Sequence, residues 1–351
     1  MSGINSDDEY ELPIADRIEG LKQPYEHGLL RGQGEAEERF IEAARSGRLH
    51  HAWLLSGPRG CGKATFAFRM ARYFLQSSRD VISITFDDLD HASASDNPIF
   101  KQISHGAHPN LLHMRIPYDE KNKKFKTQLS IEEIRRTHGF FGTTAGGKGW
   151  RVAIVDRADD LTISAANALL KILEEPPERT LFFLLSEHPN RLLPTIRSRC
   201  QHLALKPLKH DDLIEALENA TDAMTFDRET LMKHGNIING SVRRAFHFES
   251  QDAGALLQDF NELINQDTYD IPKLHRFADN VSARVADEKY VFFIEFLENY
   301  LADKVRASDG RTPLVSWAEV WDKVHARISD EERLNLDRKQ TVLALFHDLR
   351  I

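Results

Sequence analysis

The sequence has little cysteine and no long apolar run. Only Cys61 and Cys200 are cysteines among its 351 residues, which excludes a disulfide framework and a four-thiolate zinc site. No stretch of about 18 apolar residues occurs, and the first residues are polar and acidic, unlike a secretory signal. The formal net charge of −8 argues against a protein that coats nucleic acid by itself. We therefore expect a cytoplasmic protein with reduced thiols, no membrane partner and no bound zinc.

The length of the chain predicts more than one domain. Strand and helix signals alternate up to about residue 206, and after Pro207 only helical periods continue to the end. We predict a flexible tail over residues 1–16, an α/β domain over 17–206, a short helical block over 207–250 and a longer one over 251–351.

Short apolar strands alternate with helices in the first part of the chain. This order is typical of an α/β domain in which a largely parallel sheet is flanked by helices. Residues 77–108 are polar and rich in Asp and Ser, and they read as partly loop. We expect strands at 52–56, 111–116, 151–156, 181–186 and 201–205, and helices at 33–46, 63–75 and 164–175.

A glycine-rich loop follows the first expected strand. The run from Gly57 to Ala64 fits the phosphate-binding pattern G-x-x-x-x-G-K-[ST] except at its last position. The backbone N–H groups of such a loop cradle phosphate oxygens, and Lys63 would reach the β- and γ-phosphates. Ala64 lacks the hydroxyl that ligates Mg²⁺, and Thr65 is a poor substitute because one helical residue turns a side chain by roughly 100°. The glycines that shape the loop are Gly57, Gly60 and Gly62.

A second acidic motif ends the strand expected at 151–156. Asp156 occupies the strand end, where a carboxylate would join the Mg²⁺ shell. ATPases of this kind continue with a glutamate that polarises the attacking water, but here Arg157 follows, and a guanidinium cannot accept a proton. We expect a site that holds ATP or ADP but hydrolyses poorly, and the sequence leaves open both the nucleotide and the Mg²⁺.

Two later motifs carry a family resemblance. The segments 167–177 (NALLKILEEPP) and 194–201 (PTIRSRCQ) resemble those of the bacterial clamp-loader subunits of the AAA+ class. The resemblance implies that Arg199 is a trans-acting arginine finger, that Ser186 lies at the first sensor and that Arg243, in the segment 240–245, lies at the second sensor. It also implies that 207–250 is the lid and 251–351 an oligomerising collar.

Within that family, an altered ATP site beside an intact arginine motif resembles the non-motor delta′ subunits. The resemblance implies a subunit of the DNA polymerase III holoenzyme that helps to load the sliding clamp onto primed DNA. Its partners would be the motor subunits and the clamp-opening subunit, and it would have little ATPase and no polymerase activity of its own. The zinc module that many relatives carry is not expected here, because 77–110 contains no cysteine.

Several alternatives stay open. The chain could be an active, gamma/tau-like ATPase motor subunit, or a phosphate-loop nucleotide kinase. Arg199 and Arg243 could each form an ordinary structural ion pair. Lys171, Glu174 and Glu175 could form either a solvated helix face or a contact with a partner.

Overall fold

The structure, a computed structural model, divides into two compact units. The first comprises Met1–Thr225 with Gly240–Val242, and the second comprises Phe226–Asn239 with Arg243–Ile351. The structure describes residues 13–76, 84–142, 149–222, 226–250, 253–266, 268–283, 287–307, 314–334 and 336–350.

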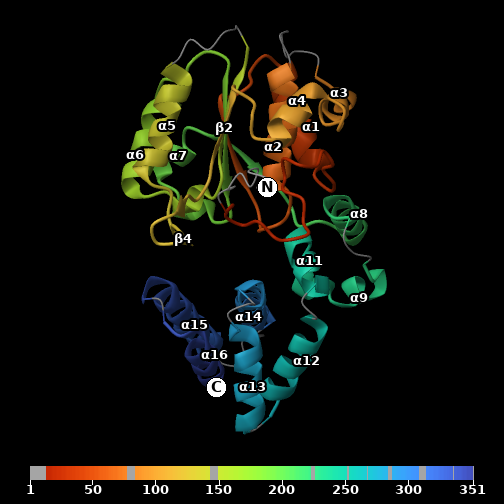
Figure 1. Ribbon diagram of the computed structural model, residues 1–351, viewed down its shortest axis with the longest axis vertical. Helices are drawn as coiled ribbons and strands as arrows, with labels where there is room; N and C mark the ends of the chain where they lie inside the picture. The colour runs from red at the N-terminus through yellow and green to blue at the C-terminus, as the bar shows by residue number, and fades with distance from the viewer. Residues whose placement is uncertain are drawn as a thin grey trace, which may run out of the picture. The chain divides into compact units, whose positions relative to one another are not determined.

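A five-stranded parallel sheet forms the centre of the first unit (Figure 1). The strand order is β2-β5-β6-β1-β7, so the strand that precedes the glycine loop, β1, lies between β6 and β7. Their carboxyl ends are in register, because Ser56 pairs with Ser186 on one side and with Ala204 on the other. Ligand sites of such sheets lie beyond the carboxyl ends of the strands. The strands are β1 (Ala52–Ser56), β2 (Leu111–Met114), β5 (Arg151–Val155), β6 (Thr180–Ser186) and β7 (Gln201–Ala204).

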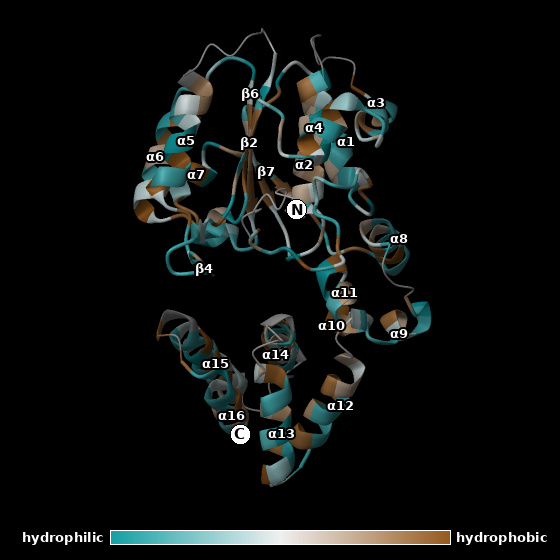
Figure 2. Cartoon of the chain, in the orientation of Figure 1, coloured by the Kyte–Doolittle hydropathy of each residue, from teal (hydrophilic) through white to brown (hydrophobic). Residues whose placement is uncertain are grey.

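Helices cover both faces of this sheet, with α1 to α4 on one side and α5 to α7 on the other (Figure 1). Alternate residues of β1 enter two separate cores: Trp53 and Leu55 pack with α1 and α2, whereas Leu54 packs with α5 and α6. Figure 2 shows both polar and hydrophobic residues on α5 and α6, as expected for helices that bury one face. The helices are α1 (Gly34–Arg45), α2 (Lys63–Gln76), α3 (Phe86–Ala92), α4 (Pro98–Ser104), α5 (Ile131–Gly142), α6 (Ile163–Glu174), α7 (Pro194–Arg197) and α8 (His210–Ala220), with 3-10 turns η2 (Ala158–Asp160) and η3 (Pro189–Arg191).

The stretch that the sequence pattern resolved least contains two short helices. Thr85 and Asp88 cap the start of α3 reciprocally, and Asn97 accepts hydrogen bonds from the first backbone N–H groups of α4. Residues 77–83 of this stretch lie outside the described residues. Farther along, the expected strand at 111–116 ends at Met114, and an antiparallel pair follows it, β3 (Tyr118–Asp119) with β4 (Lys124–Phe125).

The second unit contains helices and no strand in its described residues. Aromatic side chains form its core: Phe260, Phe293 and Phe346 are fully buried and contact one another through their rings. Phe292 and Phe296 are also buried. The helices are α9 (Arg228–Lys233), α10 (Gly235–Ile238), α11 (Val242–Ser250, whose first residue belongs to the first unit), α12 (Ala253–Ile264), α13 (Ile271–Ser282), α14 (Asp287–Ala307), α15 (Leu314–Leu334) and α16 (Arg338–Asp348).

The expected fold class is confirmed: an α/β phosphate-loop domain with a parallel sheet between helices is followed by a helical part. Within the described part of the chain, no helix is both long enough and apolar enough to cross a membrane.

Candidate nucleotide site

The glycine loop joins β1 to α2, as the motif requires. Gly57, Gly60 and Gly62 have φ angles of 151°, 78° and 100°, a backbone region that favours glycine. At Gly57 an added Cβ would lie 2.5 Å from the carbonyl oxygen of Leu205, so a side chain there would collide with backbone. Gly57 thus admits no side chain unless the backbone shifts, and the strand–loop–helix context of a phosphate cradle is present.

Lys63 is the first residue of α2 and is only 9% exposed. Its Nζ donates hydrogen bonds to the carbonyl oxygens of Gly57 and Pro58, at 2.8 and 2.9 Å. An ammonium group has three N–H donors, so these two contacts leave one for an anionic ligand. The lysine is therefore held inside the curve of the loop by the loop's own backbone.

The two residues after Lys63 provide no exposed hydroxyl. Ala64 packs with its methyl group against the apolar cluster of α1 and α2. Thr65 carries a hydroxyl but is 8% exposed. The start of α2 therefore offers a phosphate N–H groups and an ammonium, but at position 64 it offers no oxygen for a metal ion.

Asp156 and Arg157 follow the carboxyl end of β5. The carboxylate of Asp156 lies 3.6 Å from Nε2 of His113 on the neighbouring strand β2. Arg157 has a left-handed backbone (φ 55°), and its Nε lies 2.6 Å from a carboxylate oxygen of Asp160. Burial raises the pKa of Asp160, although the Arg157 guanidinium opposes that shift. The position directly after Asp156 therefore carries a cation that is paired with a nearby aspartate.

Ser186, the last residue of β6, is buried beside the loop. Its hydroxyl donates a 2.6 Å hydrogen bond to Asp159, and its carbonyl oxygen accepts a hydrogen bond from the backbone N–H of Gly57 at 3.3 Å. The other oxygen of Asp159 accepts hydrogen bonds from the backbone N–H groups of Glu187 and His188, at 2.6 and 3.2 Å. Asp159 therefore holds the serine hydroxyl and the chain after β6 in place, a structural role that the sequence did not indicate.

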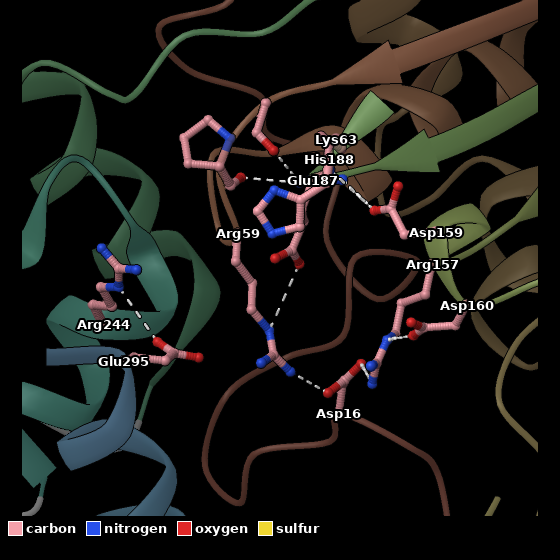
Figure 3. A network of polar contacts seen from close by, with 12 residues as sticks. Asp16, Arg59, Lys63, Arg157, Asp159, Asp160, Glu187, His188, Arg244 and Glu295 are labelled. Carbon is pink, nitrogen blue, oxygen red and sulfur yellow. Dashed lines mark hydrogen bonds and ion pairs between the residues drawn. The ribbon is translucent and has the colours of Figure 1, made fainter. Parts of the chain in front are cut away.

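Two arginines, one in the glycine loop and one after β5, are paired with the same carboxylate (Figure 3). Arg59, from the loop itself, is paired with Asp16, and Nη1 of Arg157 lies 3.7 Å from the other oxygen of Asp16. Arg59 also approaches Glu187, with Nε 4.0 Å from a carboxylate oxygen. An N-terminal aspartate thus joins the glycine loop to the end of β5, a contact that no sequence motif indicates.

The segment that leads toward the expected second sensor also touches the loop. Gly240 accepts a hydrogen bond from Leu208, and the backbone N–H of Val242 donates to the carbonyl oxygen of Gly60 at 3.1 Å. Gly240 has a φ of 63°, and a Cβ there would lie 2.4 Å from the backbone nitrogen of Leu208. Arg243 is the first residue of this segment that belongs to the second unit.

Arg199 lies apart from these residues, two positions after α7. Its Nη2 lies 2.8 Å from a carboxylate oxygen of Glu174 at the end of α6, and its Nη1 donates to the carbonyl oxygen of Thr195 at 3.0 Å. The side chain of Arg199 is 36% exposed. The thiol of the neighbouring Cys200 stays protonated at neutral pH, because burial raises its pKa to about 12.

The site residues expected from the sequence therefore fall into three places. The loop glycines, Lys63 to Thr65, Asp156 and Ser186 gather at the carboxyl ends of the strands in the first unit. Arg199 is in the same unit, on the connection between α7 and β7. Arg243 is in the second unit.

Comparison with known proteins gives a consistent family signal. The profile of the family described as "DNA polymerase III, delta subunit" matches residues 32–209, just over half of the chain. DNA polymerase III subunit delta′ of Bacillus subtilis is 37% identical over 172 residues, which are 48% of this chain and 47% of the relative. The match thus spans about half the length of that relative.

A second relative covers more of the chain at lower identity. DNA polymerase III subunit gamma of Buchnera aphidicola is 27% identical over 298 residues, 82% of this chain and 77% of the relative. Among solved structures, a gamma-subunit-related protein of Thermotoga maritima aligns over 91% of this chain and 98% of its own, with 17% identity and a TM-score of 0.42.

Proposed function

Since the chain belongs to the DNA polymerase III delta-subunit family, we propose that it is a non-motor, delta′-like subunit of the replicative clamp loader. In this proposal it supplies Arg199 to the ATP site of a neighbouring motor subunit, while its own nucleotide site hydrolyses ATP poorly. The observation that carries the proposal is the identity and pairing of the residue after Asp156. Arg157 cannot act as a base, and it is already paired with Asp160 and Asp16.

The residues at the loop fit a nucleotide's phosphates better than they fit the metal. The glycine cradle and the buried Lys63 supply donors suited to anionic oxygens. For Mg²⁺, Asp156 offers one carboxylate, but Ala64 offers no second protein oxygen. The donor set for the metal is therefore incomplete, and we propose that the loop binds ATP or ADP.

Loss of a general base alone typically costs on the order of 10²–10⁴ in rate. An incomplete metal shell adds to that loss, because the metal normally neutralises charge that develops on the phosphates. We therefore propose that phosphate binding persists at this site while turnover is slow on the timescale of a motor subunit.

Arg199 has the chemical properties of a trans-acting group. A guanidinium stays protonated at neutral pH, and its planar fork of donors matches the oxygens of a transferring phosphoryl group. In nucleotide hydrolases such an arginine is worth roughly 10³–10⁵ in rate. Glu174 and the Thr195 carbonyl engage two of the five N–H donors of Arg199, so further donors are left for a phosphate of the neighbouring subunit.

The partners of the chain follow from the same proposal. They are the motor subunits, the clamp-opening subunit, the sliding clamp and, through the assembly, primed DNA. We propose that residues 207–250 act as the lid, with Arg243 as its sensor, and that the helices within 251–351 form the oligomerising collar.

A motor subunit of the gamma/tau kind is the second candidate. The observation that favours it is the gamma relative from Buchnera, whose alignment covers 82% of this chain. In that case the Thr65 hydroxyl or a water would have to replace the missing Mg²⁺ ligand at Ala64. The attacking water would also have to be activated without a glutamate after Asp156.

ATP turnover by the purified chain separates the two candidates. The non-motor proposal predicts no turnover above background and no change when Lys63→Ala is introduced, whereas a motor subunit would turn over ATP and lose that activity in the variant. Equilibrium binding of labelled ATP and ADP to the same two proteins then tests the site itself. The proposal predicts Lys63-dependent binding in the absence of turnover.

A further inference from the structure

Asp16 is paired with two arginines, Arg59 of the glycine loop and Arg157 after β5. We propose that Arg59 and Arg157 form an anion site for the terminal phosphate of a nucleotide, and that Asp16 fills this site as an internal competitor. This inference rests on the proposal that the loop binds a nucleotide, and it extends that proposal to how access to the site is controlled.

The two arginines reach the site from independent elements. Arg59 belongs to the glycine loop, and Arg157 follows the end of β5, yet both are paired with the carboxylate of Asp16 (Figure 3). Their side chains are 28% and 42% exposed, so solvent and a soluble ligand reach them. The loop and the end of β5 are also the parts of the fold that contact a nucleotide's phosphates in phosphate-loop proteins.

The segment that carries Asp16 is attached to the first unit on both sides. Ala15 packs against the apolar cluster beneath α5 and α6, and Ile18 is 2% exposed. Farther along, the backbone N–H of Lys22 donates to the Ala220 carbonyl oxygen at 2.7 Å, and its ammonium lies 2.7 Å from Asp222. These contacts hold the carboxylate near the loop at a high effective concentration.

The backbone of Asp16 adopts an uncommon conformation. Its φ of 64° lies in the left-handed region, which asparagine and aspartate enter more readily than other non-glycine residues. A residue in this region persists when surrounding contacts favour it. The two arginines supply such contacts, because they pair with both oxygens of the carboxylate.

A terminal phosphate would compete with Asp16 for the same donors. It carries more charge than a carboxylate and has three oxygens, so it can bind two guanidinium groups at once. Among the described contacts, Asp160 also faces Arg157 and Glu187 also faces Arg59. Each of them pairs with only one of the two arginines in the described contacts, whereas Asp16 pairs with both. Removal of the Asp16 charge should therefore strengthen phosphate binding and also remove a repulsion between two anions.

Nucleotide binding by the full chain tests this inference. We compare wild type with Asp16→Asn, using titration calorimetry with ATP, ADP and adenosine. The matched control is Asp96→Asn, which changes the net charge equally at an exposed site between α3 and α4. We expect Asp16→Asn to bind ATP roughly three- to tenfold more tightly, since each exposed ion pair is worth up to about fivefold in an equilibrium constant.

The ligand series and a second variant sharpen the test. The gain should be smaller for ADP, absent for adenosine and absent in Asp96→Asn, and Asp16→Asn combined with Arg157→Ala should return toward the wild-type affinity. Equal ATP affinities of wild type and Asp16→Asn, with unchanged circular dichroism, would overturn the inference while Lys63-dependent binding still supported the nucleotide site. If neither protein bound nucleotide in a Lys63-dependent way, the inference and the proposed nucleotide site would both fail.

Discussion

Glu174 should hold the Arg199 side chain in position without being essential for catalysis. The perturbation that tests this is Glu174→Gln, which keeps the size of the side chain and removes its charge. Nη2 of Arg199 lies 2.8 Å from the Glu174 carboxylate, and the two side chains are 36% and 49% exposed. A pair this exposed is screened by solvent, so its expected contribution is about 0.2–1 kcal/mol.

That free energy sets the size of the expected effect. It corresponds to a roughly 1.4- to fivefold change in the population of Arg199 side chains held in the observed position. Removal of an arginine finger itself costs about 10³–10⁵. Glu174→Gln should therefore lower the kcat of the adjacent motor subunit by no more than about fivefold, with little change in KM, because the arginine acts on the transition state.

The assay is ATP turnover by the assembled clamp loader over a series of salt concentrations. The matched control is Glu175→Gln on the same exposed segment, and it should behave as wild type. The difference between the two variants should shrink as salt rises, because salt screens an exposed pair. Equal rates in Glu174→Gln and Glu175→Gln at low salt would refute the positioning role, and so would a loss as large as that of Arg199→Ala.

Three further predictions concern the framework of the site. Gly57→Ala should abolish nucleotide binding and lower the free energy of unfolding by about 1–3 kcal/mol, measured by denaturant unfolding. The control Gly34→Ala should not destabilise the protein, because a Cβ added there would meet no atom of a packed neighbour within 4 Å. Arg69→Met should lower the free energy of unfolding by about 3–5 kcal/mol, because it leaves the buried Glu37 carboxylate unpaired. Adding Glu37→Met to Arg69→Met should recover part of that loss. Equal stability of the single and the double variant would contradict this explanation. Burial lowers the pKa of His27 to about 4 in the folded protein. Between about pH 6.5 and 4 the unfolded chain therefore binds a proton at this residue that the folded chain does not bind. The free energy of unfolding should fall by up to roughly 3 kcal/mol as the pH is lowered from 6.5 to 4. His27→Asn should flatten that slope, and an unchanged slope would contradict the assignment.

The sequence predicted the layered architecture well because its periodicities are local. The apolar strands and the helices around the glycine loop lie within one or two residues of their expected ends. The short helix over 86–92 was not predicted, because its start depends on the Thr85–Asp88 capping pair in a strongly polar stretch rather than on an apolar stripe.

The positions of the candidate site residues in the fold were predictable, but several of their contacts were not. The glycine-rich motif located Lys63, since phosphate chemistry requires particular residues at particular spacings. The family resemblance placed Ser186 at a strand end, and the structure has it as the last residue of β6. Asp159 lies 27 residues before Ser186 in the chain, and Asp16 lies 43 residues before Arg59. Such long-range polar contacts depend on how loops meet at the carboxyl edge of the sheet, and one sequence carries no periodic signal for them.

The central claim is that this chain contributes to catalysis through Arg199 and not through its own loop. The most direct measurement uses an assembled clamp loader in which only the motor subunit adjacent to this chain keeps its phosphate-loop lysine, so that turnover reports on one site. Our account predicts that Arg199→Ala lowers the kcat of that site by about 10³-fold or more, whereas Lys63→Ala in this chain leaves it within about twofold of wild type. Unchanged turnover in Arg199→Ala, or a larger loss in Lys63→Ala, would contradict it.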